Sequence, residues 1–515
     1  MRRAAFISAL SVATDLAIGQ PLGFALKSCV LAVRLTRELG GNDGLRREVY
    51  HQALLRYIGC NADTYLMSAL FGDEIAFRRE FALIDMGQDR EVLGVVLQAM
   101  RRVSEGQGIP ALMLSMLKGL TRARSVSAPV LAGHCEVAGR IVERLGFDTA
   151  IISNVGQLYE RWDGKGLPNH LKGEAVAESV RIVTLAQDVI VLGEHFGPEK
   201  TLEIIKKRRG GAYEPRLVDT LVEAAEKLLA IYAENVSVAD VLALEPAPHY
   251  SFDDTAIDEA CLAAADFADM RLPFTLGHSR AVAKLSEAAA RRLSLPDRDI
   301  AALRRAALVH DLGELSIPAS VLMQGSNFSA HDEELVRLHP YYTERILTLA
   351  NVLPEVAAIA SQHHERLDGS GYHRGLGGAG VSMASRILAA AEFYQTLIEQ
   401  RPHRPALSAK DAAAKLKQAA LKGQFDTDAA AAVLGATDHR WAAAPTRRTE
   451  ALTPREVEVL RGLARGETAK QIARQFGLSP KTVDNHIQNL YAKIGVSTRG
   501  AAVLFAVEQG YLQMR

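Results

Sequence analysis

Apolar residues recur at intervals of three and four positions along most of the chain. Residues 281–293 (AVAKLSEAAARRL) and 299–310 (DIAALRRAALVH) show this spacing, which gathers apolar side chains on one face of an α-helix. The apolar-polar alternation of a half-buried β-strand is scarce. The pattern therefore predicts an all-α fold.

The same pattern bears on membranes and export. No run of 18 apolar residues predicts a membrane span. The apolar N-terminal run is interrupted by Asp15 and lacks a clean cleavage site, so we expect a buried helix there and not a signal peptide. We expect a cytoplasmic protein with no membrane partner.

An internal repeat organises the sequence. At a shift of 254 residues, Leu22-Gly23 corresponds to Leu276-Gly277, and Gly59 corresponds to Gly313. At a shift of 205 residues, twelve of the thirty positions from Gln157 to Ala186 are identical in the second copy. Such self-similarity indicates two copies of one helical unit.

The two shifts differ by 49 residues, which places an insertion near 61–130 of the first copy. The proline-containing stretch LALEPAPHYSFDD reads as the connector between the copies. We therefore expect two tandem helical lobes, at 1–234 and 257–436, and a third domain at 450–515.

Composition narrows the class of protein. A chain of 515 residues holds several domains of about 100 to 200 residues. Lys plus Arg and Asp plus Glu both number 60, which argues against a protein that coats nucleic acid or a membrane surface. Four widely spaced cysteines without a CxxC pair argue against a disulfide framework or a thiolate zinc site, and they fit a reducing compartment.

The second copy gathers imidazoles and carboxylates. His278, His310-Asp311, His339 and His363-His364 lie on four predicted helical segments. Imidazole and carboxylate ligands together suit iron or manganese better than magnesium. Neighbouring side chains on a helix diverge, so the adjacent pairs predict two divalent ions, and such a pair is suited to phosphoester hydrolysis.

The motifs HDLGELSIP, His339-Pro340, HHERLDGSGY and RILAAAEFYQTLIEQRPHRPA resemble the HD-GYP family of metal-dependent phosphohydrolases, which includes cyclic di-GMP phosphodiesterases. The resemblance covers about 258–434 and implies tandem HD-type helical bundles. It also implies a set of metal ligands, with Asp311 as the bridge: His278, His310, Asp311, His339, His363, His364 and Glu392.

The second copy departs from the family at three positions. Glu392 stands where the last ligand is an Asp, and its longer carboxylate can still reach a metal. Glu314 replaces the Lys of HDxGK, which exchanges a positive charge near the phosphate for a negative one. His373 replaces the Pro of the GYP signature.

Catalytic roles are predicted for Asp311 and Glu314. The family's trinuclear members carry a Glu where Phe274 stands here, so two metals at most are expected. The candidate phosphate-binding residues are Arg366, Arg401 and Arg404.

The first copy has lost most of these ligands. His134 remains opposite His339, whereas the other ligand positions hold Phe24, Arg56, Tyr57, Leu158, Tyr159 and Gln187. The glycine pattern WDGKGLP is kept, so we expect the fold to persist without the chemistry. This lobe is either a sensor or dimerisation surface, or a scaffold retained after duplication.

The last 65 residues carry four sets of helix signals and a local net charge of +5 from Thr446 to Arg515. Thr453-Pro454 with Glu456 is a capping box, Gly477 breaks a short helix, and Ser479-Pro480 begins the next. This order predicts a helix-turn-helix within a small four-helix domain, whose second helix spans Pro480–Lys493.

The segment resembles the LuxR-type DNA-binding domain through LTPREVEVL, the core IAxxxGLSPKTVxNH and KIGVSTRxxAV. The resemblance implies a homodimer on an inverted-repeat promoter. The alternative is a four-helix bundle used only for dimerisation. The predicted DNA contacts are Lys481, Thr482, Asn485, His486, Asn489 and Lys493.

Together these features predict a transcription regulator that couples an HD-GYP-type phosphodiesterase, with a nucleotide or other phosphodiester substrate such as cyclic di-GMP, to LuxR-type DNA binding. The rival hypothesis is a transcription factor whose HD-GYP lobe senses a nucleotide or metal without catalysis.

Overall fold

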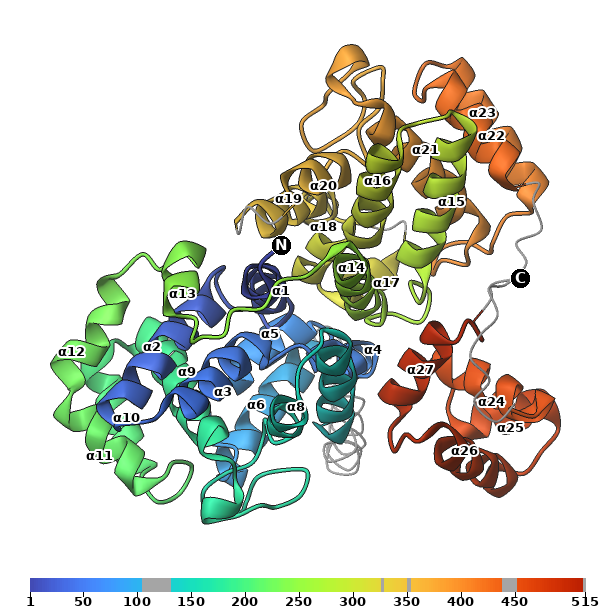
Figure 1. The fold of residues 1–515 in the computed structure, drawn as a ribbon. Helices are drawn as coiled ribbons and strands as arrows, with labels where there is room; N and C mark the ends of the chain where they lie inside the picture. Colours follow the sequence, from blue (N-terminus) through green and yellow to red (C-terminus); the bar gives the residue numbers. More distant parts are fainter. Residues whose placement is uncertain (104–130, 326–327, 350–352, 438–451, 513–515) are drawn as a thin grey trace. The chain divides into compact units, whose positions relative to one another are not determined.

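The computed structural model describes residues 1–103, 131–325, 328–349, 353–437 and 452–512 (Figure 1). Within these ranges the regular structure is helical, and β pairing is limited to isolated bridges. The predicted all-α fold is confirmed. The chain forms two compact units, Met1–Asp254 and Thr255–Arg515. No single described helix is both long and apolar enough to cross a membrane.

The first unit is a helical lobe in which α2 packs against α3 and α9. Residues 131–144 are also helical and carry His134. The remaining elements are α1 (Arg3–Ala17), α2 (Phe24–Glu38), α3 (Asp43–Leu55), η1 (Cys60–Asp63), α4 (Thr64–Phe71), α5 (Glu74–Phe81), α6 (Asp89–Val103), α8 (Thr149–Val155), η2 (Gly173–Ala175), α9 (Glu178–Phe196), α10 (Pro198–Lys207), α11 (Pro215–Glu223), α12 (Ala225–Leu229), η3 (Ala230–Ala233) and α13 (Val238–Leu244).

Helices α4, α5 and α6 fall in the region predicted as the insertion, whose last part, 104–130, lies outside the described residues. These three helices share a small apolar core of their own. Its centre is the stacked pair Phe71 and Phe77, with ring centroids 4.0 Å apart. The insertion therefore adds a small apolar core to the first lobe.

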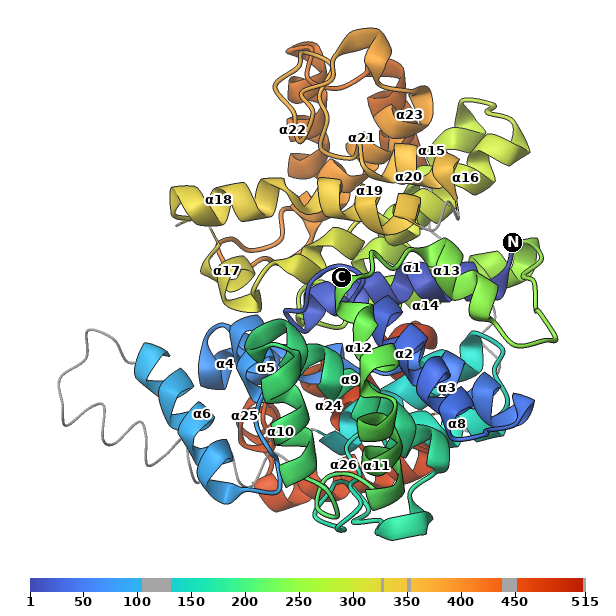
Figure 2. The ribbon, with the colours of Figure 1, turned by 90° about the vertical axis from the view of Figure 1, so that its left-hand side faces the viewer.

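The second unit begins with another helical lobe, in which α15 packs against α16, α21 and α23 (Figures 1 and 2). Its elements are α14 (Asp254–Asp269), α15 (His278–Arg292), α16 (Asp297–Val309), η4 (Leu312–Ser316), α17 (Ala319–Gln324), α18 (Ala330–Arg337), α19 (His339–Leu349), α20 (Pro354–Ala360), η5 (Gly378–Gly380), α21 (Met383–Ile398), α22 (Ala409–Leu421) and α23 (Thr427–Thr437).

Buried carboxylates reveal the repeat at atomic detail. Asp15 accepts hydrogen bonds from the backbone N–H groups of Gly23 and Ala25, and Asp269, 254 residues later, accepts one from Ser279 N–H. These bonds tie the preceding helix to the first turn of α2 and of α15. In both lobes, a buried aspartate thus fixes the position of the first residue of the following helix, Phe24 in α2 and His278 in α15.

The glycine loops match in the same way. Glu160 accepts from the backbone N–H groups of Asn169 and Leu171. Glu365, 205 residues later, accepts from those of Arg374 and Leu376. Each carboxylate satisfies two backbone donors in a loop without regular structure, which explains why the loop outlasts the loss of the neighbouring ligands in the first copy.

The C-terminal domain has the four helices that its capping signals predict: α24 (Pro454–Ala464), α25 (Ala469–Phe476), α26 (Pro480–Ile494) and α27 (Arg499–Glu508). Thr453 and Thr468 each form a capping box. Gly477 ends α25 in the left-handed conformation, at φ 65°. Val483 and Leu490 of α26 are fully buried in the domain core, which fixes the face that α26 leaves exposed.

Candidate functional site

The centre of the second lobe is the turn between α16 and η4, which carries His310 and Asp311. A Cβ atom on Gly313 would lie 1.9 Å from the carbonyl oxygen of His339, so only glycine lets η4 pack directly on α19. This close approach brings His310-Asp311 beside His339. Gly59 makes the same approach to the carbonyl oxygen of His134 in the first lobe.

Local backbone contacts orient three of the imidazoles. The Nδ1 atoms of His310, His339 and His363 lie 2.6 to 2.8 Å from carbonyl oxygens three residues earlier. A carbonyl oxygen can only accept, so each Nδ1 donates to it and each Nε2 is the ring nitrogen turned toward the site. A histidine held in this way is ready to bind a metal through Nε2.

Asp311 stands between two groups of these Nε2 atoms. Its Oδ2 atom lies 3.1 Å from His310 Nε2 and 3.7 Å from His278 Nε2. Its Oδ1 atom lies 3.5 Å from His363 Nε2 and 3.7 Å from His339 Nε2. One carboxylate thus faces two donor clusters with different oxygens.

The two clusters have the composition of metal sites. His278, His310 and Asp311 have donor atoms within 4.8 Å of one another, and so do those of His339, His363 and His364. Burial and neighbouring imidazoles hold the pKa values of His363 and His364 well below their usual range, so both rings are neutral, as a metal ligand must be.

Glu392 reaches the first cluster from α21. Its Oε2 atom lies 2.8 Å from His278 Nε2 and 3.5 Å from His310 Nε2. These three atoms are buried, and none of them makes a hydrogen bond with the described residues. Buried polar atoms that converge without hydrogen bonding one another are costly unless a cation joins them, so the residues present fit a metal.

Glu399 is a residue of this site that no pattern in the sequence marks. Its fully buried carboxylate lies 2.8 Å from His278 Nδ1 and also accepts hydrogen bonds from Gln395 and Arg401. It fixes the orientation of the His278 ring from behind. No local pattern marks it, because it follows α21 in a stretch that reads as surface.

Glu314 lies at the edge of the same cluster. Burial and the negative charge of Asp311 raise the pKa of Glu314 to about 8, against the partial compensation of Arg401 and Arg271. At neutral pH this side chain is mostly protonated. Glu314 therefore does not bring to the site the full negative charge that its place in the sequence suggested.

The three candidate phosphate-binding arginines differ in placement. Arg401 bonds Glu399 at 2.8 Å, with the same nitrogen 3.4 Å from His278 Nδ1, and Arg366 donates to the carbonyl oxygens of His363 and Glu365. The guanidinium of Arg404 is directed to backbone carbonyl oxygens: those of Thr396, Leu397, Glu399 and Pro405.

In the first lobe, the corresponding region holds other contacts. Arg56 donates to Thr184 and to the carbonyl oxygen of Leu158, and Phe24 is buried at the start of α2. His134 bonds Asp63 and Tyr159. The described residues of this lobe contain no group of three or more donors placed for a metal.

The candidate DNA-binding residues lie on α26. Lys481, Asn485 and Asn489 are exposed and follow one another at four-residue intervals, so they share one face of the helix. Thr482 and His486 beside them are partly exposed. Lys493 is engaged elsewhere, because its Nζ atom lies 2.8 Å from Glu456 in the α24 cap.

Comparison with known families and proteins gives consistent matches. The HD domain family matches residues 103–217 and 263–429, which together make up more than half of the chain. The family described as bacterial regulatory proteins, luxR family, matches 450–506. Both resemblances drawn from the sequence motifs are thereby confirmed.

Among curated proteins, the chain is similar to the 3'3'-cGAMP-specific phosphodiesterase 3 of Vibrio cholerae, at 28% identity over 414 residues that cover 79% of this chain and 89% of that protein. A match of this length includes both lobes. A cyclic di-GMP phosphodiesterase of Pseudomonas aeruginosa is 32% identical over 154 residues, 30% of this chain and 37% of that protein.

The fold is also shared with a solved structure. The crystal structure of a cyclic GMP-AMP-specific phosphodiesterase from Vibrio cholerae superposes with a TM-score of 0.59. The superposition covers 86% of this chain and 99% of the other, at 24% sequence identity. The tandem-lobe fold thus exists in a second protein.

Proposed function

Because this chain belongs to the HD domain family and carries a C-terminal domain of the luxR family of bacterial regulatory proteins, we propose that it is a transcription regulator in which a metal-dependent phosphodiesterase lobe acts on DNA binding. We assign the phosphodiesterase to 257–436, the DNA-binding domain to 450–515, and a lobe without catalysis to 1–234, with its insertion near 61–130.

The observation that carries the proposal is the position of Asp311 between two clusters of imidazoles. His278, His310 and Glu392 would hold one ion with Asp311, and His339, His363 and His364 would hold a second. The neutral nitrogen and carboxylate donors favour iron or manganese. When bound, two such ions supply an activated water for attack on phosphorus.

The protein's own residues supply the rest of the site. Glu399 holds the His278 ring, and Asp311 with Glu314 carries the catalytic acid-base roles. Arg366 and Arg401 are the proposed phosphate partners nearest the imidazoles. The relatives that act on 3'3'-cGAMP and cyclic di-GMP support a cyclic dinucleotide as the substrate class.

The test is an assay of the full-length protein, purified without chelator, together with elemental analysis. We expect about two iron or manganese ions per chain and hydrolysis of 3'3'-cGAMP or cyclic di-GMP. The Asp311→Asn variant, which removes the bridging charge, serves as the inactive control. A metal-free protein inert toward both dinucleotides and toward generic phosphodiesters would overturn the proposal.

The second candidate function is a transcription factor whose lobe binds a nucleotide or metal without cleaving it. Glu314 favours it, because this position is the HDxGK lysine in the family and holds a buried acid here. Glu314→Lys separates the two. If activity appears only in the variant, the natural protein is a sensor, whereas turnover by the wild type makes it an enzyme.

For the output domain we propose a homodimer that reads an inverted-repeat promoter through α26. The exposed row of Lys481, Asn485 and Asn489 supports this, since lysine meets phosphate or guanine and asparagine reads adenine edges. Occupancy of the phosphodiesterase lobe is expected to change the affinity of the domain for DNA.

A further inference from the structure

The first lobe contains a cavity of about 400 Å³ at the place where its repeat partner carries the metal ligands. Arg56 and Tyr57, the counterparts of His310 and Asp311, line it together with His134, the counterpart of His339. The volume lies within the range of small-molecule sites. Loss of the ligands has therefore left a pocket and not a filled core.

One wall of this cavity is built by the insertion. Helices α4, α5 and α6 contribute apolar side chains to it, among them Phe71, Phe77 and Phe81. The rings of Phe77 and Phe81 lie 5.6 Å apart in a stacked arrangement. A wall of this kind favours an apolar or aromatic molecule and disfavours an anion.

Four arginines line the cavity, and three of them lie near carboxylates. Arg78 bonds the carbonyl oxygens of Ala17 and Cys60, and Arg161 pairs with Asp85 at 2.6 Å and Asp163 at 2.9 Å. Arg78 also lies 3.3 Å from Asp63, and Arg208 lies 3.9 Å from Glu91, whereas Arg56 donates to the Thr184 hydroxyl and the Leu158 carbonyl oxygen. Most of the positive charge at the cavity is thus paired, which leaves the apolar wall as its main recognition surface.

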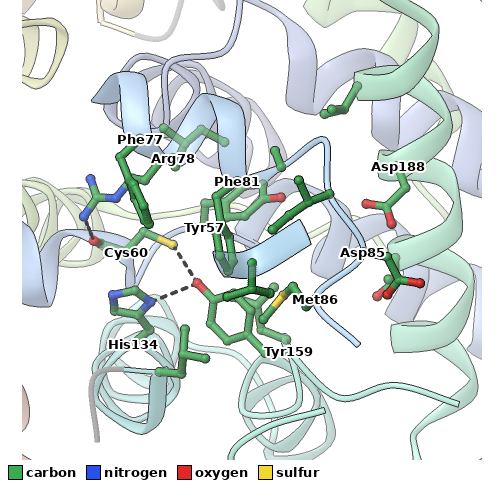
Figure 3. A pocket seen from close by; sticks show the side chains of 18 of the residues that line it. Tyr57, Cys60, Phe77, Arg78, Phe81, Asp85, Met86, His134, Tyr159 and Asp188 are labelled. Carbon is green, nitrogen blue, oxygen red and sulfur yellow. Dashed lines mark hydrogen bonds between the residues drawn. The ribbon is translucent and has the colours of Figure 1, made fainter. Parts of the chain in front are cut away.

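One end of the cavity holds a connected set of reactive groups, of which Figure 3 shows Cys60, His134 and Tyr159. Asp63 Oδ1 lies 2.5 Å from His134 Nε2, and His134 Nδ1 lies 2.9 Å from the Tyr159 hydroxyl. That hydroxyl lies 3.5 Å from the Cys60 Sγ atom. A carboxylate thus orients an imidazole, and the Tyr159 hydroxyl connects that imidazole to the thiol, in a chain of the kind that activates nucleophiles.

Two features indicate that the end of the cavity around Cys60 has a role beyond packing. The second carboxylate oxygen of Asp63 is buried at the cavity and makes no hydrogen bond with the described residues. The residue as a whole is only 4% exposed, so water does not readily satisfy this oxygen. Cys60 also occupies, at the shift of 254 residues, the position of Glu314. A thiol therefore stands where the other lobe carries its catalytic-site acid.

The four cysteines differ in their acidity. Burial alone would raise the pKa of the Cys60 thiol, but the His134 imidazole and the Arg78 guanidinium outweigh it and hold this pKa below its ordinary value. Burial opposes protonation of His134, yet Asp63 and Cys60 raise its pKa to about 10. In contrast, burial raises the pKa of Cys135 and of Cys261 to about 12, and it raises that of Cys29 further.

From this arrangement we infer that the cavity of the first lobe is a modification site, in which Cys60 adds to a small apolar electrophile such as an α,β-unsaturated carbonyl compound. The Cys60 sulfur forms a C–S bond to the β-carbon, and the electron pair of the C=C bond moves to the α-carbon. The thiol proton, held on His134, then passes to the α-carbon. No oxidant or reductant is consumed.

The test is alkylation of the full-length native protein by N-ethylmaleimide, with peptide mass spectrometry to follow each cysteine. We expect Cys60 to react at least roughly tenfold faster than Cys29, Cys135 and Cys261, because only the thiolate attacks. Cys135 is the matched control, since it follows His134 in sequence and is also buried, at 7% exposure against 3% for Cys60. Equal rates at all four cysteines, with full labelling after denaturation, would overturn the proposal.

The pH dependence of alkylation provides a second test. Between pH 7.5 and pH 6.0 the rate at an ordinary thiol falls about thirtyfold, whereas we expect a clearly smaller fall at Cys60. The variant His134→Gln should restore the steep dependence. An equally steep pH dependence of alkylation at Cys60 in the wild-type protein would contradict a lowered pKa of its thiol.

Selectivity tests the apolar wall. Relative to their rates with glutathione, N-phenylmaleimide should label Cys60 about tenfold better than the negatively charged 3-maleimidopropionate, because only the phenyl group gains from apolar burial. Equal relative rates would show that the wall does not select the molecule, and the inferred class of electrophile would be wrong.

Discussion

The Oε2 atom of Glu392 lies 2.8 Å from Nε2 of His278, although Glu392 stands where the HD-GYP family has a shorter Asp. The longer side chain starts on α21 and reaches the donor cluster around Asp311, where its Oε2 atom also lies 3.5 Å from His310 Nε2. Glu at this position therefore still brings a carboxylate to the cluster.

The first prediction follows from this contact. Glu392→Gln removes a negative donor from the cluster, and we expect the affinity for iron or manganese to fall by at least about tenfold, with loss of metal on dialysis. Elemental analysis and metal titration of the chelator-treated protein measure the effect. Glu392→Asp is the matched control and should retain metal. Equal metal content in wild type and Glu392→Gln would exclude Glu392 as a ligand.

The second prediction concerns Glu399, whose buried carboxylate lies 2.8 Å from His278 Nδ1. Glu399→Gln leaves the side chain in place but removes the charge that orients the ring, so metal affinity should fall by about 10- to 100-fold. The exposed pair Glu287 and Arg291 supplies the control Glu287→Gln, which should have no effect. Unchanged affinity in Glu399→Gln would show that its contact with His278 only supports the fold.

Glu399 also illustrates what the sequence could and could not provide. The histidines and Asp311 were predicted from their order along the chain, and the structure brings these donors together. Glu399 was not found, because its role depends on the packing of the end of α21 against the first turn of α15, which the sequence does not reveal. A buried glutamate outside any periodic segment looks like a surface residue in the sequence.

The first lobe shows the same limit. The repeat and its lost ligands were visible at fixed shifts, and so was the insertion. The grouping of Cys60, Asp63 and His134 was not, because 71 residues separate Asp63 from His134. In the C-terminal domain, by contrast, Pro, Gly and capping boxes set the boundaries locally, and α26 ends one residue from its predicted end.

The third prediction is a pH dependence. Folding raises the pKa of Glu314 from 4.5 to about 8, so between these values the folded protein keeps a proton that the unfolded chain has released. The free energy of unfolding therefore decreases as pH rises from 4.5 to 8. Glu314→Gln removes this dependence, and in chelator-treated protein it should melt roughly 10 °C above wild type at pH 8.

The same difference should shrink at pH 5, where Glu314 is protonated in the folded protein. Melting curves of both proteins across this range measure it. The exposed Glu334 of α18 offers the control Glu334→Gln, for which no pH-dependent difference is expected. A gap between Glu314→Gln and wild type that stays constant from pH 5 to pH 8 would show that Glu314 is ionised in the fold.

The last prediction distinguishes the residues of α26 that contact DNA from one that stabilises the domain. Lys481 is exposed and faces solvent, so Lys481→Ala should weaken promoter binding and lower the slope of log K against log salt by about 1. Asn485→Ala should reduce the free energy of promoter binding by about 1 to 3 kcal/mol and relax the preference for one base pair.

Lys493 is held by Glu456, so Lys493→Ala should lower the stability of the domain more than it lowers the salt slope of DNA binding. Titration of a labelled promoter at several salt concentrations, with exposed Gln488→Ala as control, distinguishes these effects, and an unchanged slope in Lys481→Ala would remove α26 from the DNA interface.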